Sequence, residues 1–112
     1  MAYNEKLARR IRERLSDLPV LEEKEMMGGL VFMVNDKMCV GVIKDEMMCR
    51  IDRDIHESVV EIPGCRTMDF TKRPMIGYIL IDDSAMRTQK DFEFWINLAL
   101  DFNVRAKSSK KK

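Results

Sequence analysis

The sequence predicts an α+β domain in which a mainly antiparallel sheet of about five strands packs against an N-terminal and a C-terminal helix. Apolar runs between residues 30 and 51 are separated only by short polar turns, which is typical of an antiparallel meander. Segments with helical spacing of apolar residues stand before and after this meander. A chain of 112 residues is long enough to bury one core, so we expect one domain.

The first helix is predicted over residues 4–16. Asn4 is a residue type that caps helix N-termini. Leu7, Ile11 and Leu15 recur every four residues and therefore form one apolar stripe. This stripe is expected to face the sheet.

A strand at the edge of the sheet is predicted over residues 20–27, where three glutamates discourage pairing with another sheet. Gly28 and Gly29 follow it and indicate a turn, a bulge or the close approach of another backbone. Phosphate binding by these glycines is disfavoured, because no further glycines follow in P-loop spacing and no helix starts there.

The central meander is predicted over residues 30–51. Its apolar runs hardly alternate with polar residues, so both faces of these strands should be covered. Two helices can cover one face, and a third helix, a loop or a second copy of the chain would cover the other. The turn at residues 35–37 has the composition that sets hairpin register. The candidate structural motif consists of Gly28, Gly29, Asn35, Asp36, Lys37 and Met38.

Residues 52–62 are predicted to form a short helix with His56, the only histidine, on its outer side. Residues 65–75 are expected to be a loop whose anchors, Met68, Phe70 and Met75, point inward. Residues 76–81 form the last predicted strand.

The last helix is predicted to begin at Thr88 and to end near Asn103. Its apolar residues cover a broad face, so it should be the main cover of the sheet, with Trp95 in the core. Residues 105–112 have nothing apolar to bury and are predicted to be a disordered basic tail. The domain is therefore expected to span residues 1–104.

No catalytic, cofactor-binding or metal-binding residue is predicted. Cys39, Cys49 and Cys65 form no CxxC pair, and we expect them to be small core residues. A lone histidine lacks the partners that orient a base or a metal ligand. The N-terminus has charges where a signal peptide needs an apolar stretch, and no run approaches membrane-spanning length. A cytoplasmic protein that does not enter membranes is expected.

Positive charge gathers at the two ends of the chain, although the net charge is only +1. Lys6, Arg10 and Arg14 form a row along the first helix, and the tail adds further bases. We expect this row to be a solvated face. The alternative is a surface that contacts phosphate or an acidic protein.

Three stretches in this order resemble the N-terminal domain of the TfoX/Sxy family: MMGGLVFMVNDKMCVGVI, MDFTKRPMIGYILI and DFEFWINLALDFN. The resemblance covers nearly the whole chain and implies an α+β domain without known catalytic residues. It also implies a link to competence regulators that act on transcription with a partner protein. Those regulators carry a second, helical domain, so this chain resembles a stand-alone version of the first.

The sequence and the resemblance together favour a non-enzymatic regulatory or protein-interaction module. Its expected partner is a protein, for example a transcription factor, and a homodimer through an uncovered sheet face is a natural extension. The alternative is a nucleic-acid-associated protein that uses the basic first helix and the basic tail. The second interpretation is weakened by the acidic middle of the chain. An enzyme or redox protein would need a reactive group, and none is visible.

Overall fold

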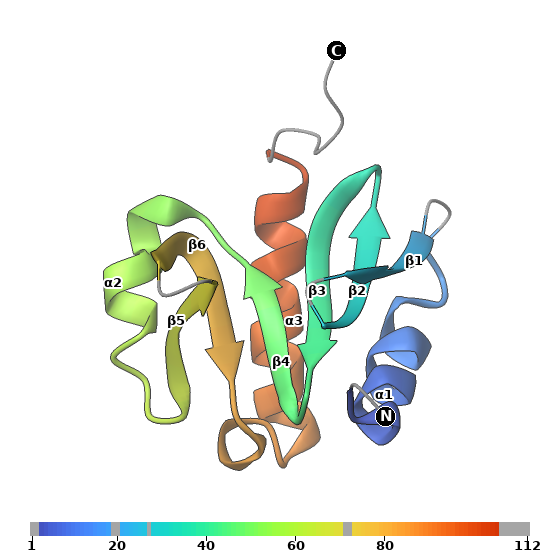
Figure 1. The fold of residues 1–112 in the computed structure, drawn as a ribbon, viewed down its shortest axis with the longest axis horizontal. Helices are drawn as coiled ribbons and strands as arrows, with labels where there is room; N and C mark the ends of the chain where they lie inside the picture. Colours follow the sequence, from blue (N-terminus) through green and yellow to red (C-terminus); the bar gives the residue numbers. More distant parts are fainter. Residues whose placement is uncertain (1–2, 19–20, 27, 71–72, 106–112) are drawn as a thin grey trace.

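The computed structural model describes residues 3–18, 21–26, 28–70 and 73–105 of the chain. In this part an antiparallel six-stranded sheet has the strand order β1-β2-β3-β4-β6-β5 (Figure 1). The strands are β1 (Leu21–Met26), β2 (Gly29–Val34), β3 (Lys37–Ile43), β4 (Glu46–Arg50), β5 (Cys65–Phe70) and β6 (Arg73–Ile81). The helices are α1 (Glu5–Leu15), α2 (His56–Val59) and α3 (Gln89–Asn103), with 3-10 turns η1 (Arg53–Ile55) and η2 (Asp83–Ala85). The predicted α+β class is confirmed.

Both predicted helix caps are present. The side chain of Asn4 accepts a hydrogen bond from the Leu7 backbone N–H at 3.1 Å and caps α1. Thr88 caps α3 in the same way through the Asp91 backbone N–H at 3.0 Å. The helices therefore begin where the sequence places them, because each cap satisfies a backbone donor that the first turn leaves free.

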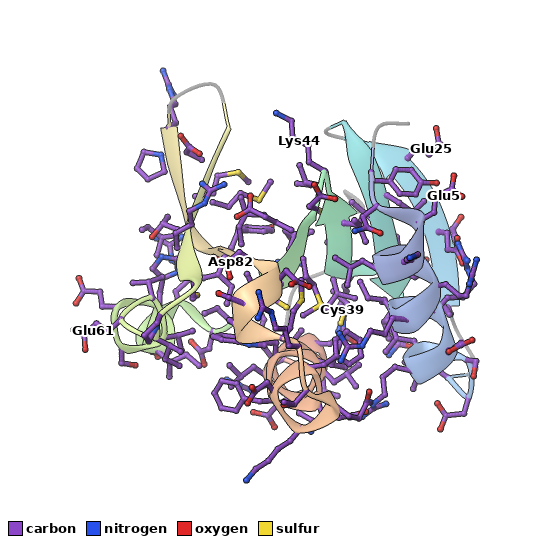
Figure 2. The ribbon with its side chains drawn as sticks, turned by 90° about the horizontal axis from the view of Figure 1, so that it is seen from below. Glu5, Glu25, Cys39, Lys44, Glu61 and Asp82 are labelled. Atoms are coloured by element: carbon purple, nitrogen blue, oxygen red, sulfur yellow. The ribbon has the colours of Figure 1, made fainter. Side chains whose placement is uncertain are left out.

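The first face of the sheet carries all three described helices. The main core joins Leu7, Ile11 and Leu15 of α1, and Val59 of α2, to the sheet. Four residues of α3 complete it: Phe92, Trp95, Ile96 and Ala99. Figure 2 shows α1 and α3 against the sheet, with Cys39 pointing into the interior and Glu5, Glu25 and Glu61 pointing outward. This core confirms that α3 is the main cover and that Trp95 is buried.

The second face of the sheet is apolar too. Its buried residues are Val31, Met33, Met48, Met68 and Leu80, and Met38, Ile43, Met75 and Tyr78 pack beside them. No residue of a described helix belongs to this cluster. Every residue of β2 is buried, which confirms that the central strands are covered on both faces. Across this face Arg66 of β5 reaches Glu46 of β4 with a 2.6 Å ion pair that crosses β6.

The two turns of the predicted motif have special backbones. Asn35 and Asp36 join β2 to β3 with φ angles of 55° and 64°, a left-handed pair that suits a two-residue hairpin. Gly28 has a φ of 77°. A Cβ on Gly29 would overlap the backbone oxygen of Val42, so the predicted close approach of another backbone is confirmed.

Two predictions about the middle of the chain are wrong. Residues 65–70 form the edge strand β5 rather than a loop, because they pair with β6. Among the described side chains of this strand, only Cys65 and Met68 are buried, so the strand signal in the sequence is weak. Phe70 is placed in β5, but its side chain lies outside the described part. The helix after β4 is short, and His56 is 2% exposed rather than outward-facing.

Candidate functional site

The basic row on α1 splits between two environments. Arg10 donates from Nη1 to the backbone oxygen of Met86 at 2.7 Å and from Nη2 to that of Thr88 at 3.3 Å. Its guanidinium carbon also lies 4.0 Å from the centre of the Phe92 ring, a cation–π contact. Arg10 therefore holds α1 against the start of α3.

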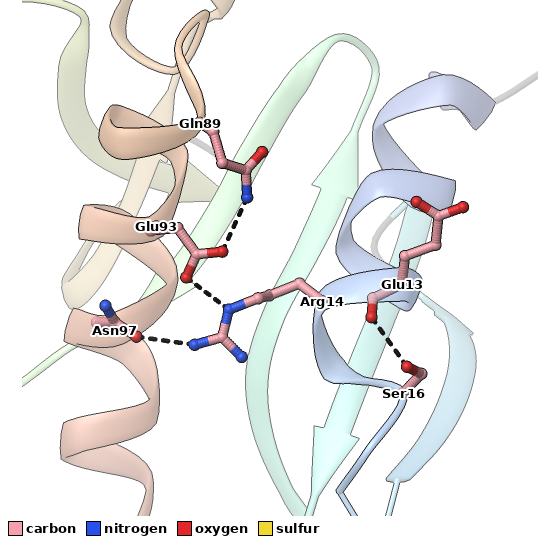
Figure 3. Close-up of polar contacts among 6 residues, drawn as sticks. All are labelled: Glu13, Arg14, Ser16, Gln89, Glu93 and Asn97. Atoms are coloured by element: carbon pink, nitrogen blue, oxygen red, sulfur yellow. Dashed lines mark hydrogen bonds and ion pairs between the residues drawn. The ribbon is translucent and has the colours of Figure 1, made fainter.

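Arg14 connects the same two helices one turn further along (Figure 3). Its Nε lies 2.6 Å from Oε1 of Glu93, and its Nη2 donates to Asn97 at 3.0 Å. Gln89 donates to the other oxygen of Glu93 at 2.8 Å. The hydrogen bond from Arg14 is the main cause that lowers the pKa of Glu93. The expectation of a solvated face is wrong for Arg10 and Arg14, which both bind α3.

Lys6 is the exposed member of the row and borders a hollow of about 440 Å³. Lys6 and Arg10 line it together with the carboxylates of Asp45 and Asp83. Charges of both signs therefore meet in this hollow. Such a lining does not favour an anion over a cation, so we assign no ligand to this hollow.

The residues of the turn motif have structural positions. Lys37 donates from Nζ to the backbone oxygen of Asn103 at 3.0 Å, and Asn103 donates from its side chain to Val34 at 3.2 Å. These bonds fasten the β2–β3 hairpin to the end of α3. Asn35 and Asp36 are exposed at the turn, and Met38 packs on the second-face cluster.

A hollow of about 420 Å³ with a mixed polar and apolar lining lies beside Phe94 on α3. Its lining residues are Ile62, Pro63, Ser84, Ala85, Asp91, Phe94 and Trp95. The Phe94 side chain is 46% exposed and meets the buried Trp95 edge to face, with ring centres 4.9 Å apart. Asp91 is the one charged group among the described residues that line this hollow.

A smaller hollow of about 190 Å³ lies where α3 ends beside β4 and β6. Its lining residues are Arg50, Ile51, Arg53, Ile76, Gly77, Tyr78 and Phe102. The guanidinium carbon of Arg50 lies 5.7 Å from the centre of the Tyr78 ring and 5.8 Å from that of Phe102. Among the hollows described here, only this one is lined by two arginines and two aromatic rings.

His56 is a structural residue that is hydrogen-bonded to Gly77, one of the residues lining that smaller hollow. Its Nδ1 accepts a hydrogen bond from the Gly77 backbone N–H at 2.9 Å, and its Nε2 lies 2.8 Å from Thr67 Oγ1. The first bond requires an unprotonated Nδ1, so Nε2 carries the proton and donates to Thr67. Burial lowers the pKa of His56, which favours this neutral form.

The three cysteines are free and buried, which confirms their assignment as core residues. Burial raises the pKa of Cys39 to about 12 and that of Cys65 to about 11, and it raises the pKa of Cys49 as well. Such thiols carry little of the thiolate that reacts with electrophiles. Among the described residues, no group of three or more histidines, cysteines and carboxylates could hold a metal ion.

Comparison with protein-family models gives a match to the TfoX N-terminal domain over residues 13–103. The chain belongs to the TfoX N-terminal domain family. The resemblance read from the sequence is thereby confirmed. Neither curated proteins nor solved structures gave a match.

The matched range of the TfoX N-terminal domain includes the two hollows beside Phe94 and Arg50, but it begins after Lys6 and Arg10. Neither hollow was predicted from the sequence. The helical spacing of Phe92, Trp95, Ile96 and Ala99 leaves Phe94 off the buried face, so its exposure could have been found. The meeting of Arg50 with Tyr78 depends on strand register, which no local pattern shows.

Proposed function

We propose that this TfoX N-terminal domain is a non-enzymatic regulatory module that binds another protein. Membership of the family supports this proposal, because the resemblance to TfoX/Sxy competence regulators implies a link to transcription regulation with a partner protein. The proposal includes a cytoplasmic location. No described helix combines the length and the apolar character needed to cross a membrane.

The exposed ring of Phe94 is the observation that carries the proposal. Large aromatic side chains that stand beside a hollow are typical anchors of protein interfaces. Phe94 is fixed from below by Trp95, whose Nε1 donates to the Ala85 backbone oxygen at 2.9 Å. The ring is therefore presented from a rigid base, which reduces the entropy lost on binding.

The lining of this hollow indicates the chemistry of the partner. Ile62, Pro63 and Ala85 offer apolar contacts, and Asp91 supplies a negative charge at the same place. We therefore expect a protein segment that inserts an apolar side chain and carries a basic residue beside it. Across residues 17–104 acids outnumber bases, which also favours a basic partner surface.

Site-specific photocrosslinking in cells tests this proposal. A photoreactive phenylalanine at position 94 should crosslink a partner protein. The same group at position 104 should not crosslink it. Val104 follows the last residue of α3 and is 74% exposed. The crosslinked protein is then identified by mass spectrometry, purified and titrated with the domain.

The titration measures how much the Phe94 side chain contributes to the affinity for the partner. Phe94→Ser should weaken binding of the purified partner about 30-fold, as expected for an interface residue worth about 2 kcal/mol. Val104→Ser should change it by less than about twofold. Equal crosslinking from both positions, or equal affinities of the two variants, would contradict a binding surface at Phe94.

The homodimer remains a prediction. The apolar second face that suggested it is already buried at its centre within one chain, with Val31 and Met48 at 0% exposure. Ile76 on β6 is an exposed large hydrophobic residue, at 42% exposure, and would be available to a second copy. Light scattering across a concentration series checks the dimer, and a molar mass that stays at the 13.2 kDa of one chain would exclude it.

A further inference from the structure

The hollow beside Arg50 has the chemistry of a site for an anion with a planar ring. The charged groups among its described lining residues are Arg50 and Arg53, and no carboxylate lines it. The rings of Tyr78 and Phe102 both lie within 6 Å of the Arg50 guanidinium. Arginine fits phosphate geometry and stacks on flat rings at the same time. A ligand that presents a phosphate next to a planar ring matches this lining.

The floor of the hollow is held in a fixed conformation. Gly77 has a φ of 95°, and its backbone oxygen accepts a hydrogen bond from Ile51 N–H at 2.8 Å. Its own N–H donates to the buried ring of His56. An added Cβ on Gly77 would come within 3.1 Å of the Arg53 side chain, so Arg53 lies over this backbone. The arginine and the rings are thus placed on a rigid base before any ligand arrives.

The size of the hollow argues for one unit of a longer chain. A pocket that encloses a whole small molecule measures about 300 Å³ or more. This hollow measures about 190 Å³ and is bordered by Ile76, which is 42% exposed. A single phosphate and part of its sugar fit inside it. An attached base would lie over the border, against apolar and aromatic side chains.

Charges of both signs surround the hollow. Three carboxylates, those of Asp52, Asp54 and Asp101, are next in sequence to residues that line the hollow. Arg105 pairs with Asp52 at 2.5 Å and with Asp101 at 3.6 Å. The sequence that follows Arg105 contains four lysines and no acid. The attraction between an arginine of the hollow and a phosphate is expected to weaken with salt.

We propose that this hollow binds one nucleotide unit of a single-stranded nucleic acid. A phosphate binds at Arg53, beside Arg50, and the base stacks against Tyr78, Phe102 and Ile76. A duplex is a poorer ligand, because its bases are already stacked on one another and do not reach the aromatic rings. This site is separate from the hollow beside Phe94, so it stands whether or not that surface binds a protein.

Fluorescence anisotropy with a labelled 12-nucleotide thymidine strand, at low salt and with the full chain, tests the proposal. Arg53 is exposed, so Arg53→Glu should fold normally, and we expect it to weaken binding about 10-fold. Phe102→Leu should weaken binding about 5-fold through lost stacking. The matched control is Arg87→Glu, which makes the same charge change at a side chain that is 73% exposed on another part of the surface. We expect it to change the affinity less than twofold.

Two further measurements separate the site from general attraction to the tail. Amide chemical shifts on titration with the strand should move at Gly77, Tyr78 and Phe102. Thermal unfolding of each variant establishes that it is folded. The proposal is overturned if Arg53→Glu and Arg87→Glu weaken binding equally, or if shifts move only after residue 105. It is also overturned if a duplex, a free mononucleotide or a polyglutamate peptide binds as tightly as the single strand.

Discussion

His56 accepts a hydrogen bond from the backbone N–H of Gly77, and this bond joins α2 to the positive-φ position in β6. The side chain of His56 is buried, and its other ring nitrogen is paired with Thr67. One imidazole therefore satisfies two polar groups that belong to different strands. Both bonds depend on a neutral ring with the proton on Nε2.

The stability of the domain should fall below neutral pH because of His56. Burial is the main cause that lowers the pKa of His56 in the folded chain, whereas the unfolded chain takes up the proton near pH 6.5. Between the ordinary pKa and the lowered one, the unfolded state binds more protons, so the free energy of unfolding decreases as pH falls. Above about pH 6.5 the contribution of His56 to the free energy of unfolding no longer changes with pH. Urea unfolding at closely spaced pH values measures this dependence.

The matching variant is His56→Leu. It leaves the Gly77 N–H and the Thr67 hydroxyl without their partner and should cost about 1–3 kcal/mol at pH 7.5. It should also flatten the pH dependence between pH 5 and 6.5, because the chain has no other histidine. A wild-type slope that persists in this variant would show that other groups cause it.

Arg14 and Glu93 should be energetically coupled. Their 2.6 Å contact is partly shielded, with 28% and 30% of the side chains exposed. A double-mutant cycle with Arg14→Ala and Glu93→Ala should give a coupling of about 0.5–1 kcal/mol that declines in 1 M salt. The pKa of Glu93 is lowered, chiefly by Arg14, so this stabilisation is present above about pH 4.5 and is lost as pH falls below it.

The pair Arg87–Asp83 is the control for this cycle. It joins the same two types of side-chain charge at 3.2 Å, but it is an i, i+4 pair within a short segment and its side chains are 73% and 76% exposed. We expect no measurable coupling there, because solvent screens the charges. Equal coupling energies in the two cycles would contradict the expectation that partial shielding strengthens the Arg14–Glu93 pair between α1 and α3.

Sequence patterns predicted the elements whose cause is local. Asn4 and Thr88 cap their helices through neighbouring backbone donors, and the Asn35-Asp36 turn forms between adjacent strands. The continuous apolar run of β2 also indicated burial on both faces correctly. These features depend on residues that are close in sequence, so their signals appear in a single window.

Features that depend on distant partners were not predictable. Arg10 and Arg14 look like a solvated row until α3 is placed beside α1. His56 looks exposed until β5 and β6 supply Thr67 and Gly77. β5 itself has too few apolar residues to be recognised, because an edge strand is defined by its pairing with β6. In each case the missing information is tertiary contact.

Gly29 should tolerate no side chain, whereas Gly28 should tolerate some. A Cβ on Gly29 would overlap the backbone oxygen of Val42, which belongs to the central strand β3 and cannot easily move. Gly29→Ala should therefore destabilise the domain by about 3 kcal/mol or more. At Gly28 no atom lies within 4 Å of an added Cβ, and only its φ of 77° opposes a side chain. Gly28→Asn should cost less than about 1 kcal/mol, since asparagine adopts this conformation.

Thermal unfolding of the two glycine variants measures the difference. For a domain of about 100 residues, each kcal/mol lowers the unfolding temperature by roughly 4–8 °C. We expect a fall of more than about 12 °C for Gly29→Ala and only a few degrees for Gly28→Asn. Similar shifts in the two variants would mean that backbone conformation, rather than contact with Val42, requires glycine at this turn.

The three cysteines should react slowly in the folded chain. Burial raises the pKa of Cys39 to about 12 and that of Cys65 to about 11, so little thiolate is present at pH 8. Cys65 has the larger exposed fraction, 8% against 1% for Cys39, and should therefore react first. Cys49, at 0% exposure and with its pKa raised as well, should react last. Labelling with a disulfide reagent in buffer and in urea, followed by peptide mass spectrometry, gives the order. A cysteine that reacts as fast in buffer as in urea would contradict its burial and would have to be reconsidered as a reactive group.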